Sequence, residues 1–252
     1  MAADRTLVLA RIGLAVVFGV GFALFVVRNL PEDPAPPEPT VHRTAFADGT
    51  TWSEVWFLDG ERHGTTSTFW EDGRPATLDT YDRGRLDGVS RAHYANGRIK
   101  HEGQYVLGYA DGLWLRWYEN GQLRSRGEYD TGLAVGPWTY WFDNGVVYME
   151  AVCKGGVVDG PVRIHHPIGT LIGAGRMHGV LREGTWETWY YSGEREGRLE
   201  YENGRLHGPC RYWRVDGSYD TARSGIYEHG ERTGPLDEAA AAGVPVDLER
   251  PR

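Results

Sequence analysis

Two adjacent histidines, His165 and His166, are the most suggestive candidates for chemistry in this sequence. Imidazole is a common metal ligand, but a metal site needs further ligands close by. Neighbouring residues of an extended strand point to opposite faces, so these two rings could not hold one ion if the segment is a strand. Each also stands where related segments of the chain carry an aromatic residue. We therefore interpret both as substitutions within rows of rings and expect no metal.

Carboxylates, glycine-rich loops and serines are the other groups that could support catalysis. Glycoside hydrolysis needs two carboxylates about 5–10 Å apart, one of them with a pKa raised by burial. The glutamates that could serve are Glu102, Glu128, Glu150 and Glu187. Nothing singles out a pair among them, no glycine-rich segment has the strand–GxxxxGK–helix context of a phosphate loop, and no serine lies in a nucleophile elbow. We predict that the chain is not an enzyme and uses no cofactor.

Glycines recurring every 24 residues define the elements that carry these side chains. The first series is Gly49, Gly73, Gly97, Gly121, Gly145, Gly169, Gly193 and Gly217, and six of these eight follow Asp or Asn. A second series keeps the same step: Gly64, Gly88, Gly112, Gly136, Gly160, Gly184 and Gly208. Three or more units with a fixed period of this length are typical of a repeat protein.

Each repeat has the pattern of a β-hairpin centred on a first-series glycine. In WLRWYENGQLRSRGEYDTG, from Trp114 to Gly132, we expect Asn120 and Gly121 to form a two-residue turn with positive φ at both residues. With the glycine as position 0, position −3 then pairs with +2, −4 with +3 and −7 with +6. The fold class predicted from successive hairpins is all-β: an elongated single-layer antiparallel β-meander of about eight 24-residue hairpin repeats.

The two faces of this sheet differ in composition. The first face takes positions −7, −5, −3, +2, +4, +6 and +8 and is apolar. At position −7 stand the rings of Trp114, Trp138 and Trp186, and the residues expected to face them are Gly127, Ala151 and Leu199. A large ring lying over a glycine compensates for the side chain that the glycine lacks.

The second face takes the remaining strand positions and is predicted to be solvated. Arg91 is expected to face Glu102, and Glu187 to face Arg198. A single row of exposed rings runs through it at position −4: Phe69, His93, Trp117, Trp141, His165, Trp189 and Trp213.

Bulk composition narrows the classes of partner and the redox chemistry. The chain has 252 residues and a net charge of −8, which argues against nucleic acid as a partner. Cys153 and Cys210 are the two cysteines. They would lie five strand spacings apart, about 24 Å, so we expect two buried free thiols and no disulfide.

The N-terminal region has the composition of a membrane anchor. We predict a cytoplasmic tail at residues 1–5, a transmembrane signal anchor at 6–28 and a Pro- and acid-rich linker at 29–40. A cleaved signal peptide is the alternative. Arg5 and Arg11 precede most of the apolar run, so the N-terminus is expected inside the cytoplasm and the repeats outside it, at the inner membrane.

The motifs of the middle repeats resemble a known family. GLWLRWYENGQLRSRGEYDTG (Gly112–Gly132), GPWTYWFDNG (Gly136–Gly145) and GTWETWYYSG (Gly184–Gly193) are similar to the MORN-repeat variant, which in bacteria often carries the label of a YwqK-type antitoxin component. The resemblance covers a MORN-like repeat domain at 41–235, followed by a C-terminal cap or tail at 236–252. It implies antiparallel sheets that act in protein–protein contact or as membrane-associated scaffolds, with no catalytic residues.

These observations lead to a hypothesis about function. We expect a membrane-anchored scaffold that binds an unknown protein, another copy of itself through the sheet edges, or a surface polymer. The alternatives are a structural spacer without a ligand and an antitoxin-type neutraliser of a partner protein. The candidate binding surface is Trp117, Trp141, Trp189, Trp213, Trp114, Trp138, Tyr118 and Tyr190.

Overall fold

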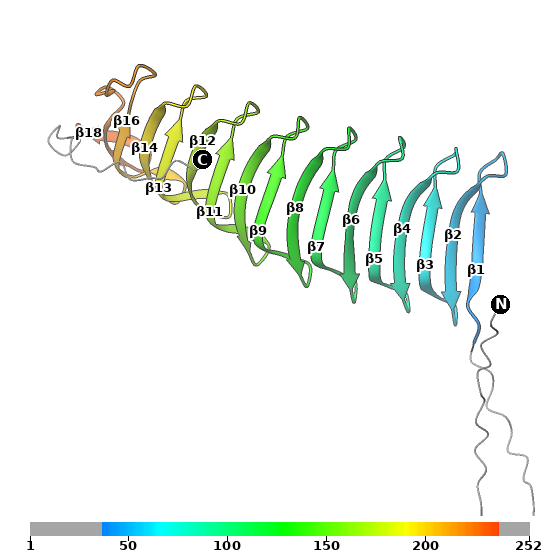
Figure 1. Ribbon diagram of the computed structural model, residues 1–252. Coiled ribbons are helices and arrows are strands. Elements are labelled where there is room, and N and C mark those ends of the chain that lie inside the picture. The colour runs from blue at the N-terminus through cyan, green and yellow to red at the C-terminus, as the bar shows by residue number, and fades with distance from the viewer. Residues whose placement is uncertain (1–36, 237–252) are drawn as a thin grey trace, which may run out of the picture. The chain divides into compact units, whose positions relative to one another are not determined.

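The computed structural model describes residues 37–236, which form strands joined by turns (Figure 1). The strands are β1 (Thr40–Ala45), β2 (Thr51–Leu58), β3 (Glu61–Phe69), β4 (Pro75–Asp82), β5 (Arg85–His93), β6 (Ile99–Val106), β7 (Tyr109–Trp117), β8 (Leu123–Asp130), β9 (Leu133–Trp141), β10 (Val147–Lys154), β11 (Val157–His165), β12 (Leu171–His178), β13 (Leu181–Trp189), β14 (Arg195–Glu202), β15 (Arg205–Leu206), β16 (Gly208–Tyr212), β17 (Gly225–Glu228) and β18 (Glu231–Gly234). Within these 200 or so described positions, none belongs to a helix capable of crossing a membrane. The predicted tail, the predicted anchor at 6–28, the start of the linker and residues 237–252 of the predicted cap lie outside the described part of the chain.

The sheet is a single open antiparallel meander, as the glycine period predicts. Each strand from β1 to β14 pairs with the next strand in the chain. At the C-terminal end β14 pairs with both β15 and β16, β16 pairs with β17, and β17 pairs with β18. Figure 1 shows this succession from β1 to β18. No second layer of described residues covers either face.

The Asn-Gly turns differ from the predicted two-residue form. The amide of Gly121 donates to the carbonyl of Tyr118 at 2.9 Å, and the amide of Tyr118 donates to the carbonyl of Gln122 at 2.9 Å. Gly121 has a φ of 91°, whereas Asn120 is not among the residues with positive φ. This is a three-residue loop in which a type I turn is followed by a left-handed glycine. The side-chain oxygen of Asn120 accepts the amide of Gln122 at 2.9 Å, which stabilises this alternative.

The two-residue turns occur at the opposite end of the strands. Thr131 and Gly132 both have positive φ, 47° and 83°, between the paired residues Asp130 and Leu133. This is the type I′ geometry that the sequence analysis places at Asn120–Gly121. The assignment of a two-residue turn to Asn120–Gly121 was therefore wrong. The side chain of Asn120 stabilises the three-residue loop, but the same backbone hydrogen bonds also form around Gly169, which follows Ile168.

The turn type also changes the pairing close to it. Arg116 pairs with Ser125, and Trp114 pairs with Gly127, so the predicted register is confirmed along the body of the hairpin. Trp117, at position −4, pairs with Leu123, at position +2, instead of with position +3. One residue of β8 is therefore left over as a bulge, and the same shift recurs in the other repeats.

The core lies on the first face and is built from rings over glycines. Trp138 faces Ala151 in the predicted register, but its indole covers Gly127 of the preceding strand, β8. Trp114 covers Gly103 and Trp186 covers Gly175 in the same way. The expected complementarity of ring and glycine is present, but it joins each repeat to the one before it.

Towards the C-terminus the core becomes a contiguous cluster. Its buried members are Ala151, Val162, Trp186, Leu199, Cys210 and Tyr212. Cys153 and Cys210 are free and buried, as predicted, and burial raises the pKa of both thiols.

The second face is less solvated than its composition predicts. The predicted pairs of Arg91 with Glu102 and of Glu187 with Arg198 are present in the register. Glu187, however, is only 7% exposed. The tryptophans at position −4 are half-buried, so they are less exposed than predicted.

Candidate functional site

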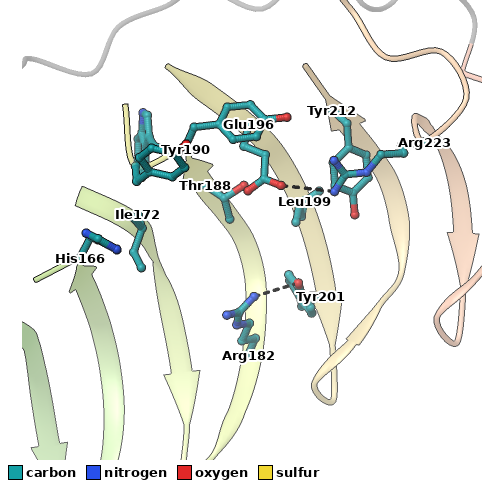
Figure 2. Close-up of a pocket in the computed structure, with 12 residues that line it drawn as sticks. His166, Ile172, Arg182, Thr188, Tyr190, Glu196, Leu199, Tyr201, Tyr212 and Arg223 are labelled. Atoms are coloured by element: carbon teal, nitrogen blue, oxygen red, sulfur yellow. Dashed lines mark hydrogen bonds and ion pairs between the residues drawn. The ribbon is translucent and has the colours of Figure 1, made fainter. Parts of the chain in front are cut away.

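A hollow of about 540 Å³ lies among the strands from β12 to β16 (Figure 2). Its lining combines aromatic, aliphatic and charged side chains: His166, Ile172, Arg182, Thr188, Trp189, Tyr190, Tyr191, Glu196, Leu199, Tyr201, Tyr212 and Arg223. Aromatic walls with a few polar groups are typical of binding sites.

Three glycines lie on the first face in the strands beside the hollow. β12 places Gly173 and Gly175 at successive first-face positions, and β14 places Gly197 at another. The indole of Trp186 covers Gly175 and approaches Gly173, but no comparable ring covers Gly197, whose neighbours are Thr188 and Leu199. Side chains that line or border the hollow therefore lie over all three glycines.

Arg182 forms one wall of the hollow and is held by two aromatic rings. Its guanidinium carbon lies 4.5 Å from the centroid of Trp186 and 5.4 Å from that of Tyr201. Nη1 donates to the hydroxyl of Tyr201 at 3.0 Å, as the dashed line in Figure 2 marks. Stacking and one hydrogen bond orient this cation at the site.

Arg223 holds the opposite wall in a similar way. It lies 4.1 Å from the ring centroid of Tyr212 and donates to the carboxylate of Glu196 at 3.4 Å. Burial raises the pKa of Tyr212 to about 12, so its hydroxyl is neutral near neutral pH. The hollow therefore has two arginines with different partners. Arg223 forms an ion pair with Glu196, whereas Arg182 forms no ion pair with any described residue.

The residues of the predicted binding surface occupy three environments. Trp189 and Tyr190 line the hollow. Trp114 and Trp138 are 4% and 3% exposed and belong to the core, so in this structure they offer no surface to a partner. The others are half-buried along the sheet: Trp117, Trp141, Trp213 and Tyr118.

The tyrosines at position −3 have a structural task in addition. The hydroxyl of Tyr118 donates to the carbonyl of Trp141 at 2.8 Å, and that of Tyr190 donates to the carbonyl of Trp213 at 2.9 Å. Each bond connects one repeat to the next. A binding role for either ring stays a prediction.

Sequence reasoning did not single out Arg182, Tyr191 or Arg223. Tyr191, at the edge of the hollow, is 67% exposed. Its place after Tyr190 in a Trp-Tyr-Tyr run is the one signal that could have drawn attention to it. Arg182 and Arg223 carry no such signal, because the tyrosines on which they stack, Tyr201 and Tyr212, lie far from them in sequence.

The histidine pair is divided between a strand and the turn that follows it. His165 ends β11, and His166 begins the following turn and lines the hollow. Within residues 37–236, no three side chains of His, Cys, Asp or Glu are grouped as a metal site would need.

One repeat has a recognisable relative. Residues 110–131 match the model of the MORN repeat variant family. The matched stretch contains nearly all of β7, the Asn120–Gly121 turn and β8. The resemblance is thereby confirmed for this repeat, and the same pair of turn hydrogen bonds recurs at every first-series glycine. No curated protein matches the chain.

Proposed function

We propose that the chain is a non-catalytic repeat scaffold that binds a protein partner, and that the hollow between β12 and β16 holds part of that partner. The observation that carries the proposal is the composition of the hollow. Tyr190, Tyr201 and Tyr212 surround an aliphatic floor that includes Leu199, and Tyr191 stands exposed at the edge. Tyrosine, tryptophan and arginine are the residues that most often dominate binding energy at protein interfaces.

The single-layer architecture supports a binding role. A sheet with one apolar face normally buries that face against another layer. Here the first face carries the core rings, and no described residues form a covering layer. A partner segment lying on this face would supply the missing apolar contacts.

The membrane anchor at residues 6–28 is a separate proposal that rests on sequence alone. An apolar segment of that length would tether the repeats at the inner membrane, on its outer side. Membrane fractionation of the full chain and of a form without residues 6–28 tests it. Recovery of the full chain in the soluble fraction would contradict the anchor without bearing on the hollow.

A photo-crosslinking amino acid at position 191 of the full chain, expressed in intact cells, tests the binding proposal. Tyr109 is the matched control, because it is a tyrosine of similar exposure, 60% against 67%, at the start of β7, far along the sheet. We expect a captured protein at position 191 that is absent at position 109. The purified partner should then bind the chain, and Tyr191→Ala and Trp189→Ala should weaken this binding about tenfold while Tyr109→Ala leaves it unchanged.

Two results would contradict the proposal. Equal capture at both positions would remove the hollow as the site. The second result is that no protein is captured at all. If, in addition, the cells change when residues 6–28 are deleted but not when Tyr191 or Trp189 is replaced, the structural spacer is favoured. The narrower antitoxin reading requires that the captured protein be a toxin and that the chain inhibit it.

A further inference from the structure

Six tyrosine rings of the sheet each have a cationic side chain over them. The pairs are Arg62 with Tyr81, Lys100 with Tyr94, Arg116 with Tyr129, Arg124 with Tyr118, Arg182 with Tyr201 and Arg223 with Tyr212. The distances from cation to ring centroid run from 4.1 to 5.8 Å. We call these residues the cation–tyrosine row. Contacts of this kind orient a cation without neutralising it.

Carboxylates are scarce along this row. Arg223 pairs with Glu196, but in residues 37–236 none of the other five cations forms an ion pair. Asp79, a carboxylate on the first face, accepts a hydrogen bond from Ser90. The chain as a whole carries a net charge of −8. Five cations of the row therefore lie over tyrosine rings with no ion-pair partner in residues 37–236, although the protein as a whole is acidic.

Arg116 and Arg182 are the best-oriented members of the row. Arg116 lies over Trp114 at 5.6 Å and donates to the hydroxyl of Tyr129 at 3.2 Å, and Arg182 repeats this arrangement with Trp186 and Tyr201. Each guanidinium has further N–H donors in a planar fork that matches a carboxylate. Because stacking fixes the plane of the fork, less entropy is lost when a carboxylate binds.

The positions of the two arginines set a spacing. Arg116 lies on β7 and Arg182 on β13, six strands apart, which corresponds to about 29 Å at about 4.8 Å per strand. An extended peptide spans that distance with about nine residues at about 3.3 Å each. The hollow next to Arg182 has Leu199 and Ile172 in its lining, so it can take an apolar side chain.

From this geometry we infer that the first face binds an extended acidic peptide that crosses the strands. Two of its carboxylates pair with Arg116 and Arg182, and an apolar side chain close to the second carboxylate fills the hollow. The inference rests on the proposed function and specifies the chemistry of the partner. An acidic polysaccharide could offer carboxylates to both arginines, but it has no apolar side chain for the floor of the hollow, so a peptide fits the observations better.

Fluorescence anisotropy with the purified full chain tests the inference. The probe is a labelled peptide of Ser, Thr and Gly with two glutamates about nine residues apart and a leucine beside one of them. A second peptide has both glutamates replaced by glutamine, and a polyuronate oligosaccharide serves as the third ligand. We expect the acidic peptide to bind and its affinity to fall as salt increases, because screening weakens exposed charge pairs.

Variants of the chain locate the binding. Arg116→Gln and Arg182→Gln should each weaken binding of the acidic peptide about tenfold. Arg126→Gln is the matched control, since Arg126 is an exposed arginine of β8 on the second face. It should leave the affinity unchanged. Circular dichroism and the melting temperature of each variant show whether the fold is retained.

Several outcomes would overturn the inference. These are equal binding of the glutamine peptide, an equal effect of Arg126→Gln, and tighter arginine-dependent binding of the polyuronate. Capture of a protein at position 191 whose binding ignores Arg116 and Arg182 would overturn the acidic ligand and leave the proposed function standing. Absence of capture at that position bears on the proposed function itself.

Discussion

The indole of Trp138, on β9, lies directly across Gly127 of the neighbouring strand β8. A Cβ atom added to Gly127 would overlap ring atoms Cδ2 and Cε2 of this tryptophan. The same relationship joins Trp114 to Gly103 and Trp186 to Gly175. In the next repeat Val162 stands in place of the tryptophan and Ala151 in place of the glycine. The smaller valine thus leaves room for a residue larger than glycine.

Gly127→Ala should therefore destabilise the chain by about 2–3 kcal/mol, since overpacking forces either the ring or the backbone to move. Urea unfolding followed by tryptophan fluorescence measures the change. Gly234→Ala is the control, because Gly234 has no heavy atom within 4 Å of the added Cβ and no positive φ. In the background of Trp138→Val, the cost of Gly127→Ala should shrink to below about 1 kcal/mol. An unchanged cost in that background would show that the ring is not the cause.

The turn assignment predicts opposite effects of proline at two turns. Glu119 occupies the second position of a type I turn, where the fixed φ of proline is suitable, and the equivalent residue two repeats later is Pro167. Glu119→Pro should be neutral or stabilise the fold by about 0.5 kcal/mol. Thr131 has a φ of 47°, which proline cannot adopt, so Thr131→Pro should cost about 3 kcal/mol or more. Melting temperatures that fall equally in both variants would contradict the distinction between the two turns.

The hydroxyl of Tyr118 links its repeat to the next through the carbonyl of Trp141. Tyr118→Phe should lower the unfolding free energy by about 1 kcal/mol, the usual effect of removing one such bond. Phe142 occupies the same position in the following repeat and lacks the hydroxyl. The substitution Phe142→Tyr therefore offers the reverse change. It should stabilise the chain by a smaller amount. Denaturation curves of the two variants test whether the ring hydroxyl, and not the ring alone, connects the repeats.

Glu187 predicts a pH dependence of stability. Burial raises the pKa of its carboxyl above the ordinary value of 4.5, although Arg195 and Arg198 lie close and act in the opposite direction. The folded chain then holds this proton more tightly than the unfolded chain does, so the contribution of Glu187 is fully present below pH 4.5 and is lost as pH rises above it.

Comparison with Glu187→Gln isolates this contribution. The unfolding free energy of the wild type minus that of the variant should fall between about pH 4 and about pH 7. Urea unfolding at a series of pH values provides the measurement. A difference that rises over the same range would mean that the two arginines outweigh burial.

The sequence predicted much of the fold because the constraint is local and repeated. The spacing of glycines such as Gly121 and Gly145 was sufficient for the all-β meander, and the alternation around Trp114 was sufficient for its pairing with Gly127. The predicted conformation of Asn120 was wrong. An Asn-Gly pair suits both a two-residue turn and a three-residue loop, and the side-chain hydrogen bond of Asn120 favours the loop.

The site was predicted only in part. Trp189 and Tyr190 were named and do line the hollow, whereas Trp114 and Trp138 were named and lie in the core. Periodicity assigns a residue to a face but does not say whether the neighbouring strand leaves it open. That depends on the sizes and directions of the side chains on the neighbouring strand.

The amino-acid sequence by itself determined the 24-residue period, the order of the strands and the face of each residue along the body of a hairpin, because these follow from backbone geometry within one repeat. The tertiary structure decided which glycine each indole covers, where the sheet is hollowed and which arginines stack on tyrosines. Those contacts join residues of different strands, and their outcome depends on the sizes and directions of side chains that only the assembled sheet brings together.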